Sequence, residues 1–468
     1  MRDLRFAAAA TVIPVAAAIS VALWLSRPGK LSPLGDEPHY LVMADAVSHD
    51  FSFDLRNAYA REERTHRIYG DRLNPHVIII NHRWSPYHEP GLAMLLAVPY
   101  LVGGAIGAKL ALCMMAGLMA WALFAWLNAY MKPPDAAWLT VGLMVSLPIG
   151  FGASQIYPDL PAGIVVMVLT LWLWRLGSKD RVDEVGPEQW AAFWVATGLL
   201  PWLNAKFLVA TAVLALGAFG VLYRKRERPP PKAVWVTSSL VAIGLGTLAA
   251  YHWWAAGTLV GVRDLDELRA WPLRALMIFL GLHFDQAQGM FFQQPLLVGG
   301  VAAFVPFARR HPRFALFWMA LYAALILPNS FELARYGGGG PAGRFGWTAE
   351  WLWIIPLGWI VAEYPERSAA CVRAAVVSGI AYQLLLALRW LPVPITLFTD
   401  LNDTLDTRNS LFPAALRSAL PSFYFWDFQS YLTYAPNIVA YVAFIVLMGA
   451  GVLYRTSRHS PEPSQAPG

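Results

Sequence analysis

The chain has 468 residues, of which 57% are hydrophobic and only 14% charged, and its mean hydropathy is +0.45. Apolar surface this abundant cannot be hidden in a water-soluble core, which excludes a soluble enzyme and indicates a membrane protein. The formal net charge of +6 does not imply a nucleic-acid partner, because the basic residues fall in short loops and the tail and no basic, aromatic-interleaved face occurs.

The apolar runs are long and do not alternate with polar residues, so they predict membrane-spanning helices rather than a barrel. Twelve candidate spans follow along the chain: 6–26, 106–130, 136–153, 159–176, 188–203, 206–223, 233–256, 291–308, 313–331, 347–363, 370–390 and 433–454. The first span is longer than the apolar part of a signal peptide and lacks a small-x-small cleavage site. The expected fold class is an all-α polytopic membrane protein with a bundle of about twelve transmembrane helices.

Lysine and arginine clusters predict the orientation of this bundle. If the twelve spans alternate, the clusters at 2–5, 179–181, 224–232, 309–313, 367–373 and 455–458 all fall on the cytoplasmic side. The apolar segment 91–104 contains Pro99 and a glycine pair and is short for a span, so we expect a re-entrant or interfacial segment there. Residues 1–455 then form one transmembrane domain, and 456–468 form a disordered cytoplasmic tail.

The opposite, outer side receives the long segments 27–90, 257–290, 332–346 and 391–432. The first of them holds six of the ten histidines and many carboxylates. Its stretch "GDEPHYLVMADA" (35–46) predicts a short amphipathic helix over 38–49 in the membrane interface, since Pro38 suits a first helical position. Asp36 and Glu37 then either cap this helix or offer a carboxylate as general base to a hydroxyl acceptor.

This stretch, placed after one N-terminal span, resembles the start of the GT-C superfamily of integral-membrane glycosyltransferases, which includes protein O-mannosyltransferases and lipid A aminoarabinose transferases. Other segments resemble the family in the same order along the chain: "YHEPGLAMLLAVPY" (87–100), "IYPDLPAG" (156–163), "LPWLNAKFLV" (200–209), "GLHFDQAQGMFFQQP" (281–295) and "RYGGGGPAGRFGW" (335–347). One departure is that Ala342 and Gly343 separate Pro341 from Arg344, where the family more often has Gly-Pro-Arg without a break.

The resemblance implies roles for particular residues. Asp36 matches the catalytic base and Glu37 its supporting neighbour, while Lys206 and Arg344 match ligands of the donor phosphate. The candidate substrate-binding residues are His39, Trp84, Tyr87, His88, Glu89, Asp159 and Asp285. Three of these assignments have plain alternatives. Lys206 can instead extend to a lipid headgroup, Asp159 can instead cap a helix, and the glycines before Arg344 can instead form a flexible outer turn.

The implied function is transfer of a sugar from a polyprenyl-phosphate donor to an envelope lipid, glycan or protein hydroxyl, on the outer face of the plasma (inner) membrane. Nucleotide sugars are not expected there, so the donor must be a sugar that is already activated, as a polyprenyl-phosphate sugar is. One base and a phosphate leaving group predict a single displacement with inversion. The expected partners are this donor, the acceptor and membrane lipids, with no nucleic acid. The alternatives are a transporter or flippase of lipid-linked saccharides and an inactive scaffold of the same fold.

A metal site is not expected from the sequence. His76, His82 and His88 recur every six residues, which is no recognised zinc spacing and does not place them on one helical face. Solvent-exposed loop histidines are therefore the expectation and no cofactor is predicted, with a divalent metal site as the alternative.

Overall fold

The computed structural model describes residues 2–27, 33–178, 185–224, 232–259, 272–286, 289–332, 340–392 and 420. Nearly all regular structure in these residues is helical, as expected, and six helices are long and apolar enough to cross a membrane: Leu4–Leu25, Gly91–Asn128, Asp159–Gly177, Ala205–Tyr223, Pro312–Ser330 and Ala370–Leu388. The chain is an all-α polytopic membrane protein.

The helices occur in the following order: α1 (Arg2–Leu25), α2 (Glu37–Asp45), α3 (Arg56–Thr65), α4 (Gly91–Asn128), α5 (Pro133–Met144), α6 (Ile149–Gly152), α7 (Asp159–Ser178), α8 (Pro187–Leu203), α9 (Leu208–Arg224), α10 (Lys232–Thr237), α11 (Ser239–Ala256), α12 (Pro272–Phe284), α13 (Met290–Gln293), α14 (Leu296–Arg310), α15 (Pro312–Ser330), α16 (Ile354–Glu363) and α17 (Pro365–Trp390). Three 3-10 turns matter below: η2 (Ala205–Phe207), η4 (Arg344–Gly346) and η5 (Glu350–Trp353).

Eleven of the twelve predicted spans contain one of these helices, whereas 433–454 lies outside the described residues, as do the tail and nearly all of 391–432. Several of the eleven, such as α5 and α16, are shorter than a bilayer core requires. The structure therefore confirms the helical bundle, while the number of crossings stays a prediction.

The segment 91–104 is a helix that a kink at Gly104 separates from the apolar helix after it, and its re-entrant or interfacial placement stays a prediction. It forms the first part of α4, whose 38 residues are two helices joined at this kink. A straight helix of this length would measure about 57 Å, nearly twice a bilayer core. Gly104 interrupts it with a non-helical φ of 58° and ψ of −147°, so the chain changes direction there.

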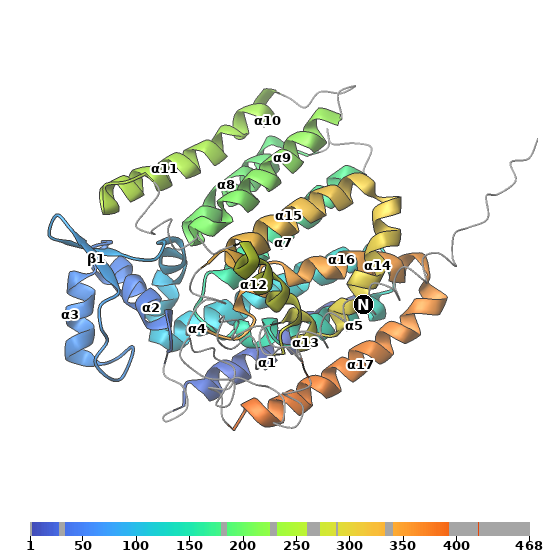
Figure 1. The fold of residues 1–468 in the computed structure, drawn as a ribbon, viewed down its shortest axis with the longest axis horizontal. Coiled ribbons are helices and arrows are strands. Elements are labelled where there is room, and N and C mark those ends of the chain that lie inside the picture. The colour runs from blue at the N-terminus through green and yellow to red at the C-terminus, as the bar shows by residue number, and fades with distance from the viewer. Residues whose placement is uncertain are drawn as a thin grey trace, which may run out of the picture.

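The first loop folds into a small unit of two helices and a hairpin, which lies at the left end of the bundle in Figure 1, away from the N-terminus. Arg61 of α3 holds this unit together, because its guanidinium donates to the carboxylates of Asp45 and Asp50. The antiparallel strands β1 (Val77–Ile80) and β2 (Arg83–Pro86) pair with Ile80 opposite Arg83. Positive φ angles at Asn81 and His82 fit a tight two-residue turn between them.

Helix α2 is present where a helix was predicted, but it is not amphipathic. Eight of its nine residues are buried, and it packs against α4 and α3. The predicted picture of one apolar face resting in the membrane interface is therefore wrong for this helix. Burial on all sides instead fixes its first turn, including Asp36 and Glu37, within the protein.

Two glycines create the space in which the segment after Gly340 packs. The buried ring of Trp347 lies where a Cβ on Gly152 would come within 2.6 Å of it, and a Cβ on Gly163 of α7 would lie 2.7 Å from the Trp347 carbonyl oxygen. These close approaches hold Trp347 against the start of α7. Arg344 is held with it, because the Arg344 carbonyl accepts a hydrogen bond from the Trp347 N–H.

We predict that Gly163→Ala destabilises the protein by about 1–3 kcal/mol, because the added methyl group overlaps the backbone at Trp347. The matched control is Gly177→Ala on the same helix, where nothing lies within 4 Å of the new Cβ, so alanine should leave stability unchanged or raise it slightly. Thermal unfolding midpoints of the detergent-solubilised proteins check this. Equal midpoints for the two variants would contradict the packing described.

Candidate active site

Asp36 occupies the N-cap position of α2, but its side chain does not cap the helix. Its Oδ2 instead accepts a hydrogen bond from Nη1 of Arg344 at 3.3 Å, and its Oδ1 lies 3.7 Å from Nε2 of His88. Burial opposes ionisation of this carboxyl, yet the electrostatic interactions with His88 and Arg344 outweigh it and lower its pKa to about 2. Asp36 is therefore an ionised carboxylate that faces other side chains rather than the helix backbone.

Arg344 reaches Asp36 because of the backbone around it. Gly343 has a φ of +75°, which favours glycine, and a Cβ there would lie 2.5 Å from the Gln293 side chain. The guanidinium of Arg344 is 8% exposed and lies over the ring of Tyr157 at 4.4 Å. Burial opposes its charge, but the surrounding acidic groups raise its pKa above the ordinary value, so it stays cationic. The insertion before Arg344 thus does not keep it from the site.

Lys206 points into the protein and does not extend to a lipid headgroup. It lies in η2, where its backbone N–H donates to the side chain of Asn204, and its side chain is only 7% exposed. Its ammonium donates to Asp159 at 2.5 Å and lies 4.3 Å from the centre of the Phe345 ring. Asp159, the first residue of α7, is accordingly the partner of a buried cation rather than only a helix cap.

These residues form one electrostatic cluster. Asp159 and Glu332 both interact with Lys206 and with Arg344, and Arg344 in turn interacts with Asp36. Glu332, which is 6% exposed, was not singled out in the sequence. Two cations and three carboxylates, drawn from five separate parts of the chain, thus gather beside the starts of α2 and α7.

Glu37 holds the first loop in place. Its carboxylate is buried and accepts hydrogen bonds from the backbone N–H groups of Ile156 at 2.8 Å and Leu34 at 3.1 Å. The ammonium of Lys109 on α4 lies 3.7 Å from the same carboxylate. Glu37 therefore positions its neighbour Asp36 by joining the loop to α4 and to the turn before α7.

His39, His76 and His88 of the first loop are packed against other aromatic side chains, so the expectation of solvent-exposed histidines is wrong for His76 and His88. His88 stacks on Tyr40 with ring centres 4.7 Å apart, and His76 stacks on Tyr87 at 4.6 Å. Nδ1 of His39 shares a hydrogen bond of 2.8 Å with the hydroxyl group of Tyr59. Burial and the neighbouring His76 lower the pKa of His39 to about 4. His39 is therefore neutral near pH 7.

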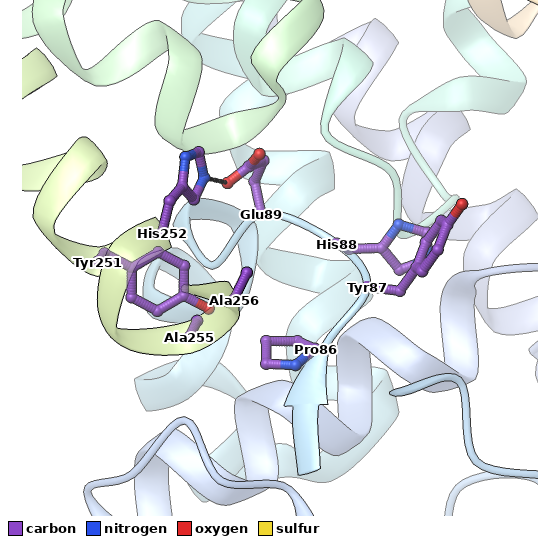
Figure 2. Close-up of a pocket in the computed structure, with 8 residues that line it drawn as sticks. All are labelled: Pro86, Tyr87, His88, Glu89, Tyr251, His252, Ala255 and Ala256. Atoms are coloured by element: carbon purple, nitrogen blue, oxygen red, sulfur yellow. Dashed lines mark hydrogen bonds and ion pairs between the residues drawn. The ribbon is translucent and has the colours of Figure 1, made fainter. Parts of the chain in front are cut away.

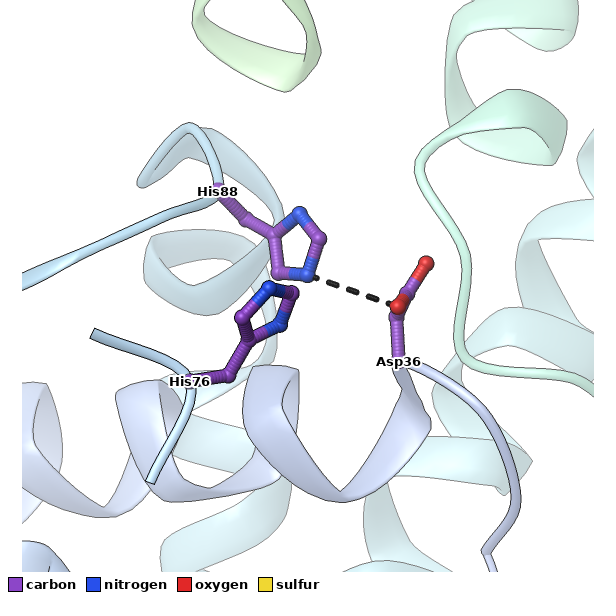
Figure 3. Close-up of side chains that lie close together, drawn as sticks. All are labelled: Asp36, His76 and His88. Carbon is purple, nitrogen blue, oxygen red and sulfur yellow. Dashed lines mark ion pairs between the residues drawn. The ribbon is translucent and has the colours of Figure 1, made fainter. Parts of the chain in front are cut away.

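Figure 3 shows His76 and His88 on one side and Asp36 on the other, with the ring of His88 directed at the carboxylate. One ligand atom from each of the three residues lies within 4.8 Å of the other two. Among the described residues, this group has the donor types and the spacing to hold a metal ion. The sequence analysis expected no metal site; His82 lies exposed at the hairpin turn, and it is Asp36 that lies beside His76 and His88.

Other candidate residues lie outside the immediate contacts of Asp36. Glu89 pairs with Nε2 of His252 on α11 at 2.8 Å, in a small cleft between the end of β2 and α11 (Figure 2). Trp84 lies in β2 beside Tyr59, at a ring distance of 6.0 Å. Asp285 is buried just after α12. Substrate contacts of these three residues stay predictions.

No protein-family model matches the chain, and no curated protein matches it. A solved structure, the crystal structure of ArnT from Cupriavidus metallidurans bound to undecaprenyl phosphate, aligns with 94% of this chain and 73% of its own. The identity is 16% and the TM-score 0.48. A likeness this low does not establish a shared activity.

We predict that Lys109→Met destabilises the protein by about 3 kcal/mol, because it leaves the buried carboxylate of Glu37 without its cation. The double variant Lys109→Met/Glu37→Gln should recover most of this loss, since a neutral amide can still accept from the Ile156 N–H. Lys132→Met, which changes an exposed lysine just after α4, is the control and should change stability by less than about 0.5 kcal/mol. Thermal unfolding measures all three, and an equal loss in the single and double variants would count against the pairing.

Proposed function

We propose that this chain is a glycosyltransferase that takes a sugar from a polyprenyl-phosphate donor and transfers it to a hydroxyl group of an envelope lipid, glycan or protein. The observation that carries the proposal is the contact of the buried Arg344 guanidinium with the Asp36 carboxylate, beside the Lys206–Asp159 pair. A base for a hydroxyl and cations for a phosphate lie together in a membrane bundle.

The chemistry of such a transfer needs both kinds of group. Negative charge accumulates on the phosphate oxygens as the glycosidic bond breaks, and fixed cations in a site shielded from water stabilise that charge. The planar guanidinium of Arg344 can bind two phosphate oxygens at once, and Lys206 supplies a second positive charge. An isoprenoid chain would lie among the apolar helices, which places its phosphate near the helix ends.

The proposed mechanism begins with an exchange of partners. The donor phosphate takes the place of Asp36 beside Arg344, which frees the carboxylate and makes it more basic. The acceptor hydroxyl gives its proton to Asp36 while its oxygen forms a bond to the anomeric carbon. The bond from that carbon to the phosphate oxygen breaks, and polyprenyl phosphate leaves with the electron pair. A single displacement of this kind inverts the anomeric configuration.

The positions of the charges favour this function over transport. A transporter of lipid-linked saccharides is expected to hold ionisable groups near the bilayer midplane, between broken helices of related halves. Here Asp36, Asp159 and Lys206 lie at or next to the starts of α2, α7 and α9. The unit that carries Asp36 also lies at the opposite end of the bundle from the N-terminus (Figure 1), in keeping with a site on the outer face of the inner membrane.

We predict that Asp36→Asn lowers the rate of sugar transfer by at least about a hundredfold, because the amide cannot accept the hydroxyl proton. Donor binding should persist, since Arg344 and Lys206 remain. The measurement is release of labelled polyprenyl phosphate by the purified protein with envelope acceptors. Asp71→Asn, an exposed carboxylate of the same loop, is the control and should retain wild-type rates; unchanged release by Asp36→Asn would refute the role of Asp36 as base.

We also predict that Arg344→Lys lowers kcat/KM for the donor by about tenfold to a hundredfold, although the charge is conserved, because lysine cannot bind two phosphate oxygens in one plane. Arg72→Lys, at an exposed arginine, is the matched control. Steady-state kinetics with varied donor concentration check the prediction. If Arg344→Lys and Arg72→Lys have the same kcat/KM as the wild type, Arg344 does not contact the donor phosphate.

A further inference from the structure

Asp36, His76 and His88 come from three points of the first loop that the fold brings together. Asp36 precedes α2, His76 precedes β1 and His88 follows β2, and Figure 3 shows the two imidazole rings beside the carboxylate. The loop that separates them in sequence is folded by the hairpin and by the contacts of α2 with α4 and α3.

The spacing of these groups is close to that of a metal site. Ligand atoms at about 2.1 Å from a tetrahedral ion are about 3.4 Å from one another. The distance from Nε2 of His88 to Oδ1 of Asp36 is 3.7 Å, and all three candidate ligand atoms lie within 4.8 Å of one another. Small rotations of the side chains would bring them to one ion.

Stacking on tyrosine rings also restricts the orientation of both imidazole rings. The ring of His88 lies on Tyr40 at an interplanar angle of 23°, and the ring of His76 lies on Tyr87 at 19°. Tyr40 is buried in α2, so the position of His88 depends on the same helix that Asp36 precedes. Three side chains with fixed directions leave little entropy to lose when an ion binds.

We propose that Asp36, His76 and His88 bind one divalent transition-metal ion, with zinc the ion that their ligand types fit best. Two imidazole nitrogens and one carboxylate oxygen are the ligand set of many zinc sites that keep a coordination position open. Magnesium and calcium bind almost only through oxygen and fit this set poorly.

The role of this metal rests on the proposed function. An acceptor hydroxyl bound at the open position would lose its proton more easily, because the ion stabilises the alkoxide. The proton would pass to Oδ2 of Asp36, the oxygen that does not bind the metal, while the alkoxide oxygen forms the bond to the anomeric carbon. The phosphate still leaves toward Arg344 and Lys206 with its electron pair.

The test is a binding measurement on the full-length protein in nanodiscs. The protein is stripped with a chelator, incubated with zinc, separated from free ion, and its zinc content is measured by elemental analysis. We expect one zinc ion per chain, with the affinity reduced at least tenfold in His76→Ala and in His88→Ala. His82→Asn, which alters an exposed histidine of the same loop, is the control and should bind like the wild type.

A second readout guards against variants that fail to fold. Zinc should raise the thermal unfolding midpoint of the wild type and of His82→Asn, but not that of folded His76→Ala. Cobalt in place of zinc should give the visible absorption of a site with nitrogen ligands in the wild type and lose it in His88→Ala. Less than one zinc per chain in the wild type, or unchanged zinc affinity in both histidine variants, would overturn the proposal.

These outcomes are separate from those of the proposed function. Zinc binding without any sugar transfer would leave the metal site standing and refute the transferase. Sugar transfer at full rate by chelator-treated protein that binds no zinc would leave the transferase standing and refute the metal site.

Discussion

The contact between Asp36 and Arg344 joins residues 308 positions apart, and the rest of the site is arranged around it. Burying a guanidinium is costly unless a carboxylate accompanies it, so the fold has to deliver both groups to one place. Glu37 secures the Asp36 end by accepting from the Ile156 N–H, and Trp347, packed against Gly152 and Gly163, secures the Arg344 end. Both supports meet at the turn before α7.

A buried ion pair such as Asp36–Arg344 adds little to the stability of the fold. Replacing a buried ion pair by apolar residues is often neutral for a fold, so its presence calls for another reason. In the proposed mechanism a donor phosphate replaces Asp36 beside Arg344, and the released carboxylate accepts the proton of the acceptor hydroxyl. The same exchange is proposed for Lys206, which pairs with Asp159 beside it. The zinc ion proposed above would bind Oδ1 of Asp36, while Oδ2 accepts the proton. One carboxylate would then be both metal ligand and general base.

Apolar runs were sufficient to predict the helices, because spans of about twenty residues have few other conformations available in lipid. The order of the motifs along the chain also predicted Asp36, Lys206 and Arg344 as site residues, and the structure brings them into one cluster. The hairpin was not predicted, because its strands have four residues each and its turn, Asn81-His82, lacks glycine. The partners of Glu37, Glu89 and His76 could not be predicted, since each depends on a segment that only the tertiary fold brings near.

The most direct test of the central claim is the stereochemistry of the reaction. Purified protein in nanodiscs would be given a panel of polyprenyl-phosphate sugars with envelope acceptors, and the anomeric configuration of the transferred sugar would be read by NMR against that of the donor. The account predicts release of polyprenyl phosphate with at least one donor and an inverted anomeric centre in the product. A retained configuration, or no release across a panel whose acceptors are competent with another enzyme, would contradict it.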